Sequence, residues 1–292
     1  MDDEEMTARW SGWKAPTLDD VLVTLDLRPA GDAFRAESLR MGHGRMYGGQ
    51  VLAQVVVAAA RAVPAKVVKS VHVQFARNGV AAEPATVRAE VVHDGGTFAT
   101  VMVRVEQDDR VLAAGTVLLH QSDDGPEQQH ATLVHPDPDA AEPRALSMIP
   151  WETRVVGGVD LMDRDVGPAE FAFWTRADLG DVAPAVHQAL VAWASDLTVI
   201  GTAMRALPDT SQLDSHRTLQ TATTAHTVWF HHPCTLADWV CFQQSATVTA
   251  GGRSFGWGQV FSRDGVLVAS YAQDAMVRTL KGDPRGPAAT TA

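Results

Sequence analysis

Cysteine is scarce in this chain, which has only Cys234 and Cys241 among 292 residues. Two cysteines cannot supply the disulfide framework of a small secreted fold. Both fall where a strand and its adjoining turn are predicted. Structural burial is therefore the expected role of each thiol.

Long hydrophobic runs are missing as well. No stretch of eighteen apolar residues is free of charge, so no membrane span is predicted and no membrane partner is expected. The first ten residues, MDDEEMTARW, carry acids where a signal peptide carries bases. We expect a cytoplasmic protein.

Basic residues are fewer than acidic ones, with 24 Lys and Arg against 35 Asp and Glu and a formal net charge of −11. This balance argues against nucleic acid as a partner, because phosphate backbones are bound by clustered bases. A small anionic ligand needs only local cations. The second half offers several, each of which is by default a solvated surface residue: Arg176, Arg253, Arg263, Arg278 and Lys281.

The remaining composition, 46% apolar and 20% charged, is that of a globular protein. Residues 121–150 lose all periodicity and gain Pro, Asp, Glu and Gln, which is typical of a linker. The sequence thus predicts an N-terminal domain over 1–120 and a C-terminal domain over 151–292. The length allows either one large or two ordinary domains.

Each predicted domain contains a helix that is apolar on nearly every side, over 48–63 and 187–207, together with strand-like runs. Thr17 and Asp20 form a capping box for a short additional helix at the start. The expected strands are 33–39, 66–76, 85–94, 97–107 and 110–120 in the first half, and 169–177, 219–232, 237–250, 253–262 and 266–278 in the second.

The halves repeat one another. Gly95-Gly96 recurs as Gly251-Gly252 and Asp109 as Asp264, at an offset of about 155 residues. One half alone would expose a sheet edge, so two halves joined edge to edge are expected. This is an α+β double hot-dog: two tandem repeats, each with a long antiparallel sheet wrapped around a central apolar helix. Edges left over after pairing suggest a homo-oligomer.

Asp196 lies near the middle of the second apolar helix, where an unpartnered charge costs several kcal/mol. Burial raises the pKa of a carboxyl, which would make Asp196 a useful general base. The alternative is a cap: Ser195 or Asp196 could begin a second helix after a break.

Six ordered segments carry a resemblance to a known family. They are Tyr47-Gly48-Gly49-Gln50, Ser70-Val71-His72 to Phe75, Trp174 to Ala177, His187 to Asp196, Gln220 to Pro233, and Gly265 to Gln273. Over roughly residues 17–278 the chain resembles the type II acyl-CoA thioesterases. The resemblance implies hydrolysis of acyl-CoA to a fatty acid and CoA, with no cofactor. It also implies a catalytic Asp, Thr and Gln that position an attacking water, here Asp196, Thr223 and Gln273.

Other readings of these residues stay open. Without the resemblance, Thr223 and Gln273 would be ordinary strand residues, and Thr223 could also attack directly as a nucleophile. Gly48 and Gly49 either allow a substrate to approach the first helix or simply end a loop. His72 is a weaker candidate for substrate binding, with a core histidine as the alternative.

The chain departs from the family pattern at Gly96, Thr97 and Ala225, which leaves the CoA contacts and the preferred acyl chain open. Residues His226, His231, His232 and Cys234 crowd one strand end, unlike the short set spacings of a zinc site, so no metal is expected. An enoyl-CoA hydratase would need an Asp and a His at the first helix, which opens with Gly-Gly-Gln. A non-catalytic acyl-CoA-binding protein is the remaining alternative.

Overall fold

The computed structural model describes residues 15–40 and 44–280 of the chain. Its helices are α2 (Leu18–Leu25), α3 (Gly48–Ala62), α4 (Pro184–Ser195) and α5 (Val199–Met204). The strands of the first half are β1 (Arg28–Ala30), β2 (Ala33–Ala36), β3 (Val67–Phe75), β4 (Ala85–Asp94), β5 (Phe98–Gln107) and β6 (Arg110–His120). Those of the second half are β7 (Glu142–Pro143), β8 (Glu152–Val155), β9 (Glu170–Arg176), β10 (Leu219–Phe230), β11 (Val240–Ala250), β12 (Arg253–Ser262) and β13 (Leu267–Thr279).

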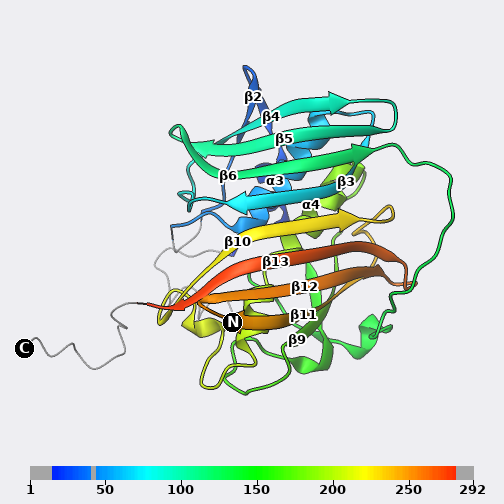
Figure 1. Cartoon of the computed structure of the whole chain (residues 1–292). Coiled ribbons are helices and arrows are strands. Elements are labelled where there is room, and N and C mark those ends of the chain that lie inside the picture. Colours follow the sequence, from blue (N-terminus) through cyan, green and yellow to red (C-terminus); the bar gives the residue numbers. More distant parts are fainter. Residues whose placement is uncertain (1–14, 41–43, 281–292) are drawn as a thin grey trace, which may run out of the picture.

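All these strands form one antiparallel sheet of thirteen strands in the order β1-β2-β4-β5-β6-β3-β10-β13-β12-β11-β9-β8-β7. The halves meet where β3 pairs with β10, with Val71 opposite Val228 (Figure 1). Thr227 and His72 are also paired there. These two are separated by 155 residues, the offset of the sequence repeat, so equivalent positions of the two repeats pair with each other at the junction.

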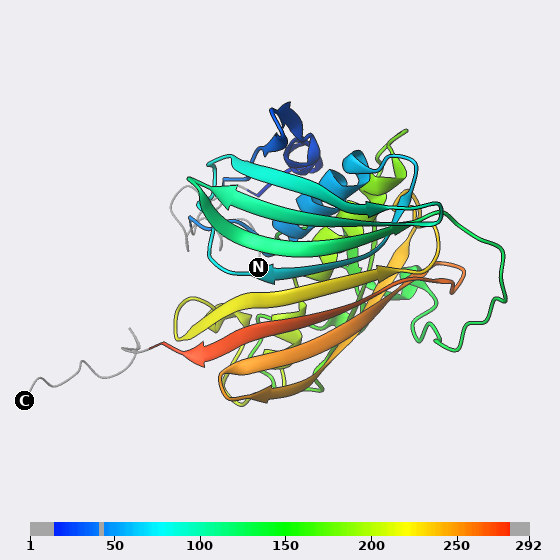
Figure 2. The same cartoon turned by 45° about the horizontal axis from the view of Figure 1, so that its top comes forward.

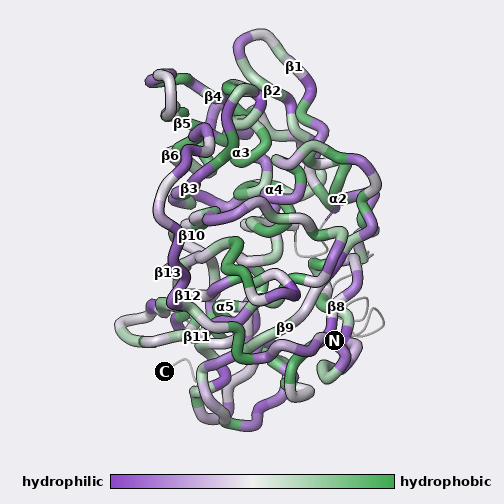
Figure 3. Tube along the Cα trace, turned by 90° about the vertical axis from the view of Figure 1, so that its right-hand side faces the viewer, coloured by the Kyte–Doolittle hydropathy of each residue, from purple (hydrophilic) through white to green (hydrophobic). Residues whose placement is uncertain are grey.

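The sheet curves around α3 and α4, which lie side by side in its hollow (Figure 2). Most of α3 is hydrophobic, as Figure 3 shows, and its residues from Gly49 to Ala59 are buried. The two helices approach closely at Gly49, where a Cβ would lie 2.4 Å from the carbonyl oxygen of Trp193. A glycine is therefore required at this crossing. None of the helices in the described ranges is long and apolar enough to cross a bilayer.

The predicted α+β arrangement is confirmed, and the long strands begin and end within a few residues of the expected positions. The capping box is also present, since Thr17 and Asp20 exchange hydrogen bonds at the start of α2. Strands β1, β7 and β8 were not expected. They are short, and length is what makes a strand pattern readable.

The single helix predicted over 187–207 is wrong. Helix α4 ends at Ser195, Asp196 is its C-cap, and α5 begins after Thr198. Neither Ser195 nor Asp196 is the N-cap of α5, so the capping alternative is wrong as well, although the break that it assumed is present. The apolar periodicity continues across the break because both helices are buried, and hydrophobicity alone does not reveal the interruption.

The predicted linker first runs over the outside of the molecule as an extended trace (Figure 1). Its later part contains a turn of 3-10 helix, Pro138–Ala140, and strand β7, which pairs with β8. Met148 is buried, and its carbonyl accepts a hydrogen bond of 2.6 Å from the indole of Trp193 on α4. The end of the linker thus packs against the second half.

Candidate functional site

A cavity of about 430 Å³ opens beside the N-terminus of α3 and the end of α4. Residues from both halves and from the end of the linker form its wall. The area of this wall is more apolar than polar, although about half of the lining residues have polar side chains. The lining residues include Met46, Gly48, Val51, Phe75, Leu112, Met148, Met162, Asp196, Leu197, Ile200, Thr223 and Met276.

Asp196 is the polar centre of this wall. One carboxylate oxygen, Oδ1, accepts a hydrogen bond of 2.7 Å from the hydroxyl of Thr223 and another of 2.7 Å from the amide nitrogen of Gln273. The backbone N–H of Gly49 donates to the same carboxylate. The three predicted catalytic side chains are therefore in direct contact, although they come from the C-cap of α4, from β10 and from β13.

The end of α4 and the start of α3 explain why the charge of Asp196 is tolerated at this position. A negative charge at the C-terminus of α4 is unfavourable, but Asp196 faces the N-terminus of α3, where the helix dipole favours it. Tyr47, the N-cap of α3, makes no capping hydrogen bond with its own side chain. Asp196 therefore acts as a cap supplied by another helix.

Burial and hydrogen bonding oppose each other at Asp196. The pKa of its carboxyl is raised from 3.8 to about 6, because desolvation raises this pKa by more than the hydrogen bonds from Thr223, Gly49 and Gln273 lower it. The carboxylate is consequently ionised at neutral pH and close to the basicity needed to take a proton from water.

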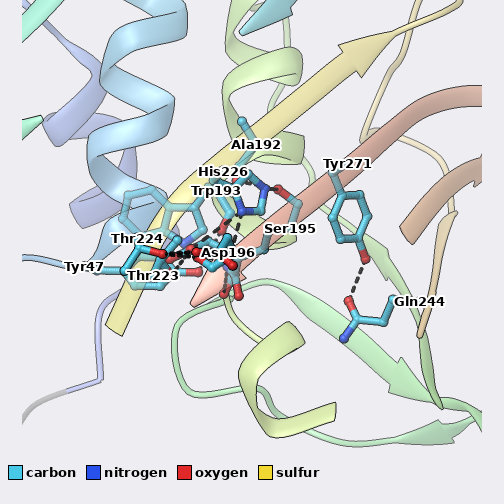
Figure 4. Close-up of polar contacts among 12 residues, drawn as sticks. Tyr47, Ala192, Trp193, Ser195, Asp196, Thr223, Thr224, His226, Gln244 and Tyr271 are labelled. Carbon is cyan, nitrogen blue, oxygen red and sulfur yellow. Dashed lines mark hydrogen bonds and ion pairs between the residues drawn. The ribbon is translucent and has the colours of Figure 1, made fainter. Parts of the chain in front are cut away.

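A β-bulge on β10 brings its polar residues to one face. The register with β13 shifts between Thr223 and Ala225, so Thr224 is an extra residue whose hydroxyl bonds to Asp274. In a regular strand, Thr223 and His226 would point to opposite faces. With the bulge, both reach the inner face near Asp196, as Figure 4 shows.

His226 extends the network behind Gln273. Its Nδ1 lies 3.2 Å from the Gln273 amide nitrogen, and its Nε2 lies 2.8 Å from the hydroxyl of Ser195. Ser195 donates its own proton to the carbonyl oxygen of Ala192, at 2.9 Å. Full burial lowers the pKa of His226 to about 3, so the imidazole is neutral.

Tyr47 closes the other side of the site. Its hydroxyl donates to the carbonyl oxygen of Trp193 at 2.7 Å, and its ring packs edge-on against that indole. Burial and the nearby charge of Asp196 raise the pKa of Tyr47 well above its usual value. The phenol therefore remains protonated and serves as a fixed wall.

The predicted substrate-binding residues have different outcomes. Gly48 lines the cavity, and a Cβ there would lie 2.7 Å from Oδ2 of Asp196. Gly49 is adjacent, but its N–H is directed to Asp196. The prediction for His72 is wrong for this cavity: its side chain is exposed on the outer face of β3, beside Thr227 and Trp229, because Val71 and Val73 take the inner face.

The cations near the cavity were not those singled out in the sequence. Arg45 and Arg77, both from the first half, lie on its wall. Of the earlier candidates, Arg278 bonds to Gln220 at the sheet end, and Lys281 lies outside the described residues. Arg45 and Arg77 precede and follow regular elements, so periodicity gave no sign of their convergence.

Two family models match the chain in sequence. The model described as acyl-CoA thioesterase N-terminal domain matches residues 36–120, and that of the acyl-CoA thioesterase C-terminal domain matches residues 123–277. The chain belongs to the type II acyl-CoA thioesterase family. The resemblance noted in the sequence is thus confirmed.

Individual family members are similar over most of their length. Acyl-coenzyme A thioesterase 8 of Mus musculus is 27% identical over 293 residues, covering 89% of this chain and 90% of the relative. Acyl-CoA thioesterase 2 of Haemophilus influenzae is 25% identical over 283 residues, covering 89% and 98%.

The crystal structure of an acyl-CoA thioesterase II from Mycobacterium marinum superimposes with a TM-score of 0.76 at 28% identity, covering 90% of this chain and 99% of that chain. A hot-dog protein of Alicyclobacillus acidocaldarius gives a TM-score of 0.71 at 19% identity, covering 89% and 98%. The hot-dog fold expected for this family member is therefore confirmed.

Proposed function

We propose that this chain hydrolyses fatty acyl-CoA thioesters to a free fatty acid and CoA, using a water molecule positioned by Asp196, Thr223 and Gln273. One observation carries the proposal. A buried carboxylate with a raised pKa receives hydrogen bonds from the Thr223 hydroxyl and the Gln273 amide on the wall of a cavity that is more apolar than polar. In a chain of this family, that arrangement suits general-base catalysis.

The proton balance can be followed at Asp196. The carboxylate takes a proton from water as the oxygen attacks the thioester carbonyl carbon. The tetrahedral intermediate then collapses, the carbon–sulfur bond breaks, and Asp196 returns the proton to the leaving thiolate. Thr223 and Gln273 hold the carboxylate in place and spread its charge, so that it need not reorganise during the reaction.

The helix end facing Asp196 supplies the electrostatic complement. The N-terminal turn of α3 directs backbone N–H groups outward, and Gly48 lets a ligand approach them without meeting a side chain. The N–H of Gly48 is the group we assign to polarising the thioester oxygen. The apolar part of the wall suits the acyl chain, and Arg45 and Arg77 on the same wall suit the phosphates of CoA.

The first prediction tests the function and the base together. Thiol release from a panel of acyl-CoAs is measured for the native chain and for Asp196→Asn, which should lower kcat by roughly 10²–10⁴-fold. His72→Ala, on the outer face of β3, serves as the matched control and should leave kcat unchanged. Full activity of Asp196→Asn would remove the carboxylate from the mechanism. Binding without thiol release at any chain length would favour the acyl-CoA-binding alternative.

The same assay separates water attack from attack by Thr223. The hydroxyl of Thr223 donates to Asp196, so a nucleophilic role is stereochemically available. Water attack predicts that Thr223→Ala retains measurable turnover and that mass spectrometry of rapidly quenched enzyme finds no acyl adduct. A stable acyl group on Thr223 would replace water attack by a covalent mechanism.

A further inference from the structure

The orientation of the Gln273 amide is fixed by more than Asp196. Its nitrogen lies 2.7 Å from Oδ1 and 3.2 Å from the backbone carbonyl oxygen of Asp196, and 3.2 Å from Nδ1 of His226. All three neighbours accept hydrogen bonds. Rotating the amide by a half-turn would place its oxygen against three acceptors.

The tautomer of His226 follows from Ser195. Because the Ser195 hydroxyl donates to the carbonyl oxygen of Ala192, it can only accept from Nε2 of His226. The proton of the neutral imidazole is therefore on Nε2, and Nδ1 is left as an acceptor for Gln273. The chain of donors runs from Gln273 through His226 and Ser195 to the backbone of α4.

We propose that His226, held by Ser195, is a positioning residue that keeps the amide nitrogen of Gln273 directed at Asp196 throughout turnover. This inference rests on the proposed function, because it concerns the step in which Asp196 carries the proton taken from water.

The need for a second anchor arises at that step. Ionised Asp196 requires an N–H donor and orients Gln273 by itself, whereas protonated Asp196 is itself a donor. A free amide could then rotate and accept the new proton through its oxygen. That hydrogen bond would stabilise the acid and withhold the proton from the leaving thiolate. Nδ1 of His226 opposes the rotation together with the backbone carbonyl oxygen of Asp196, since neither can donate to the amide oxygen.

The amide oxygen of Gln273 gives further evidence that the orientation of this side chain is constrained. Oε1 of Gln273 is buried and has no hydrogen-bond partner among the described residues. The Gln273 nitrogen thus stays directed at Asp196 and His226, although the Gln273 oxygen is left without a hydrogen bond. A buried oxygen without a partner ordinarily disfavours such an orientation of the side chain.

Two substitutions of similar size separate the two ring nitrogens. His226→Asn keeps an oxygen acceptor close to the position of Nδ1, whereas His226→Gln extends its amide toward the position of Nε2 and removes the acceptor beside Gln273. His226→Gln should lower kcat at least about tenfold with KM unchanged, and His226→Asn should restore most of the loss.

The pKa of Asp196 provides a readout that a purely structural role would not move. In His226→Gln the amide can rotate to accept from protonated Asp196, so the pKa of Asp196 should rise and the low-pH limb of kcat should move to higher pH. ¹³C NMR of aspartate-labelled protein, assigned with Asp196→Asn, measures this pKa without substrate. Other titratable or charged groups near the site are identical in the two variants: Tyr47, Arg45, Arg77, His216 and Tyr271, whose ring stacks on that of His226.

The outcomes are distinct. A raised pKa and reduced kcat in His226→Gln, both reversed in His226→Asn, support the positioning role. An unchanged Asp196 pKa in His226→Gln overturns it, as does an equal loss of kcat in both variants without any movement of the pH profile. Failure of the proposed function would instead appear as thiol release by Asp196→Asn, or as no release by the native chain. The NMR comparison remains decisive if a variant is too weak to assay.

Discussion

At the scale of single residues, the site keeps a charge where the fold disfavours one. Asp196 is buried among apolar side chains, and its hydrogen bonds recover only part of the desolvation cost, since its pKa remains raised to about 6. Asp196 therefore lowers the stability of the folded protein, and a catalytic role would explain why an acid is present at this position. His226 is a second buried titratable group, and its lowered pKa keeps it uncharged at neutral pH.

The second prediction concerns this cost. Because the folded protein holds the Asp196 proton up to about pH 6 and the unfolded chain releases it near 3.8, ionisation destabilises the fold as the pH rises through that window. Asp196→Asn lacks the penalty. Its unfolding free energy relative to the native chain should therefore increase by about 3 kcal/mol between about pH 3.5 and pH 7.

Urea unfolding at both pH values measures this difference, and titration of other groups cancels in the comparison. A stability difference that does not change with pH would mean that Asp196 is not desolvated in the folded protein.

The types of the site residues also determine which of them could be predicted from the sequence. Asp196 was identifiable because an acid inside an apolar run is unusual. Thr223 and Gln273 could be singled out only through the family resemblance, since threonine and glutamine are ordinary in strands. Their contact with Asp196 depends on the register of the sheet and on where the helices end. Neither can be predicted from the type of a single residue.

At the scale of elements, a bulge and a helix break make the site. Strict alternation along β10 would separate Thr223 from His226, and the bulge at Thr224 corrects this. No turn residue or glycine marks the bulge in the sequence, so the position of His226 could not be predicted. The long strands and α3, in contrast, follow directly from periodicity and came out as expected.

The third prediction tests the close contact between α3 and Asp196. Gly48→Ala adds a methyl group whose carbon would lie 2.7 Å from Oδ2, so the carboxylate must move. We expect a loss in kcat of at least about tenfold, because displacements of about 1 Å in a site are costly. Gly125→Ala, in the exposed linker, is the matched control, since a Cβ there meets nothing within 4 Å.

Thiol release and the circular dichroism spectrum of both variants check this prediction. Native activity in Gly48→Ala would show that Asp196 does not need the position that the structure gives it.

At the scale of the whole molecule, the sheet ends bear on association. The outermost strands, β1 and β7, have three and two residues and contain Pro29 and Pro143. Short strands with proline are poor templates for further pairing. The argument from free edges for a homo-oligomer is weakened accordingly, and self-association, like the cytoplasmic location, stays a prediction from the sequence.

The two halves are bound through β3 and β10, and the site requires both. Gly48 and Gly49 come from the first half, whereas Asp196 and the strands that contact it come from the second. The linker is exposed throughout 121–130. Covalent continuity in that stretch should therefore be dispensable once the chain has folded.

The fourth prediction uses a protease recognition sequence inserted between Asp124 and Gly125. After purification and cleavage, the fragments should elute together and retain nearly the full rate of thiol release, because the pairing of β3 with β10 and the packing of α3 on α4 hold them together. An uncleaved portion of the same preparation is the control. Fragments that separate spontaneously in buffer would show that the linker, and not the shared sheet and helix pair, keeps α3 next to Asp196.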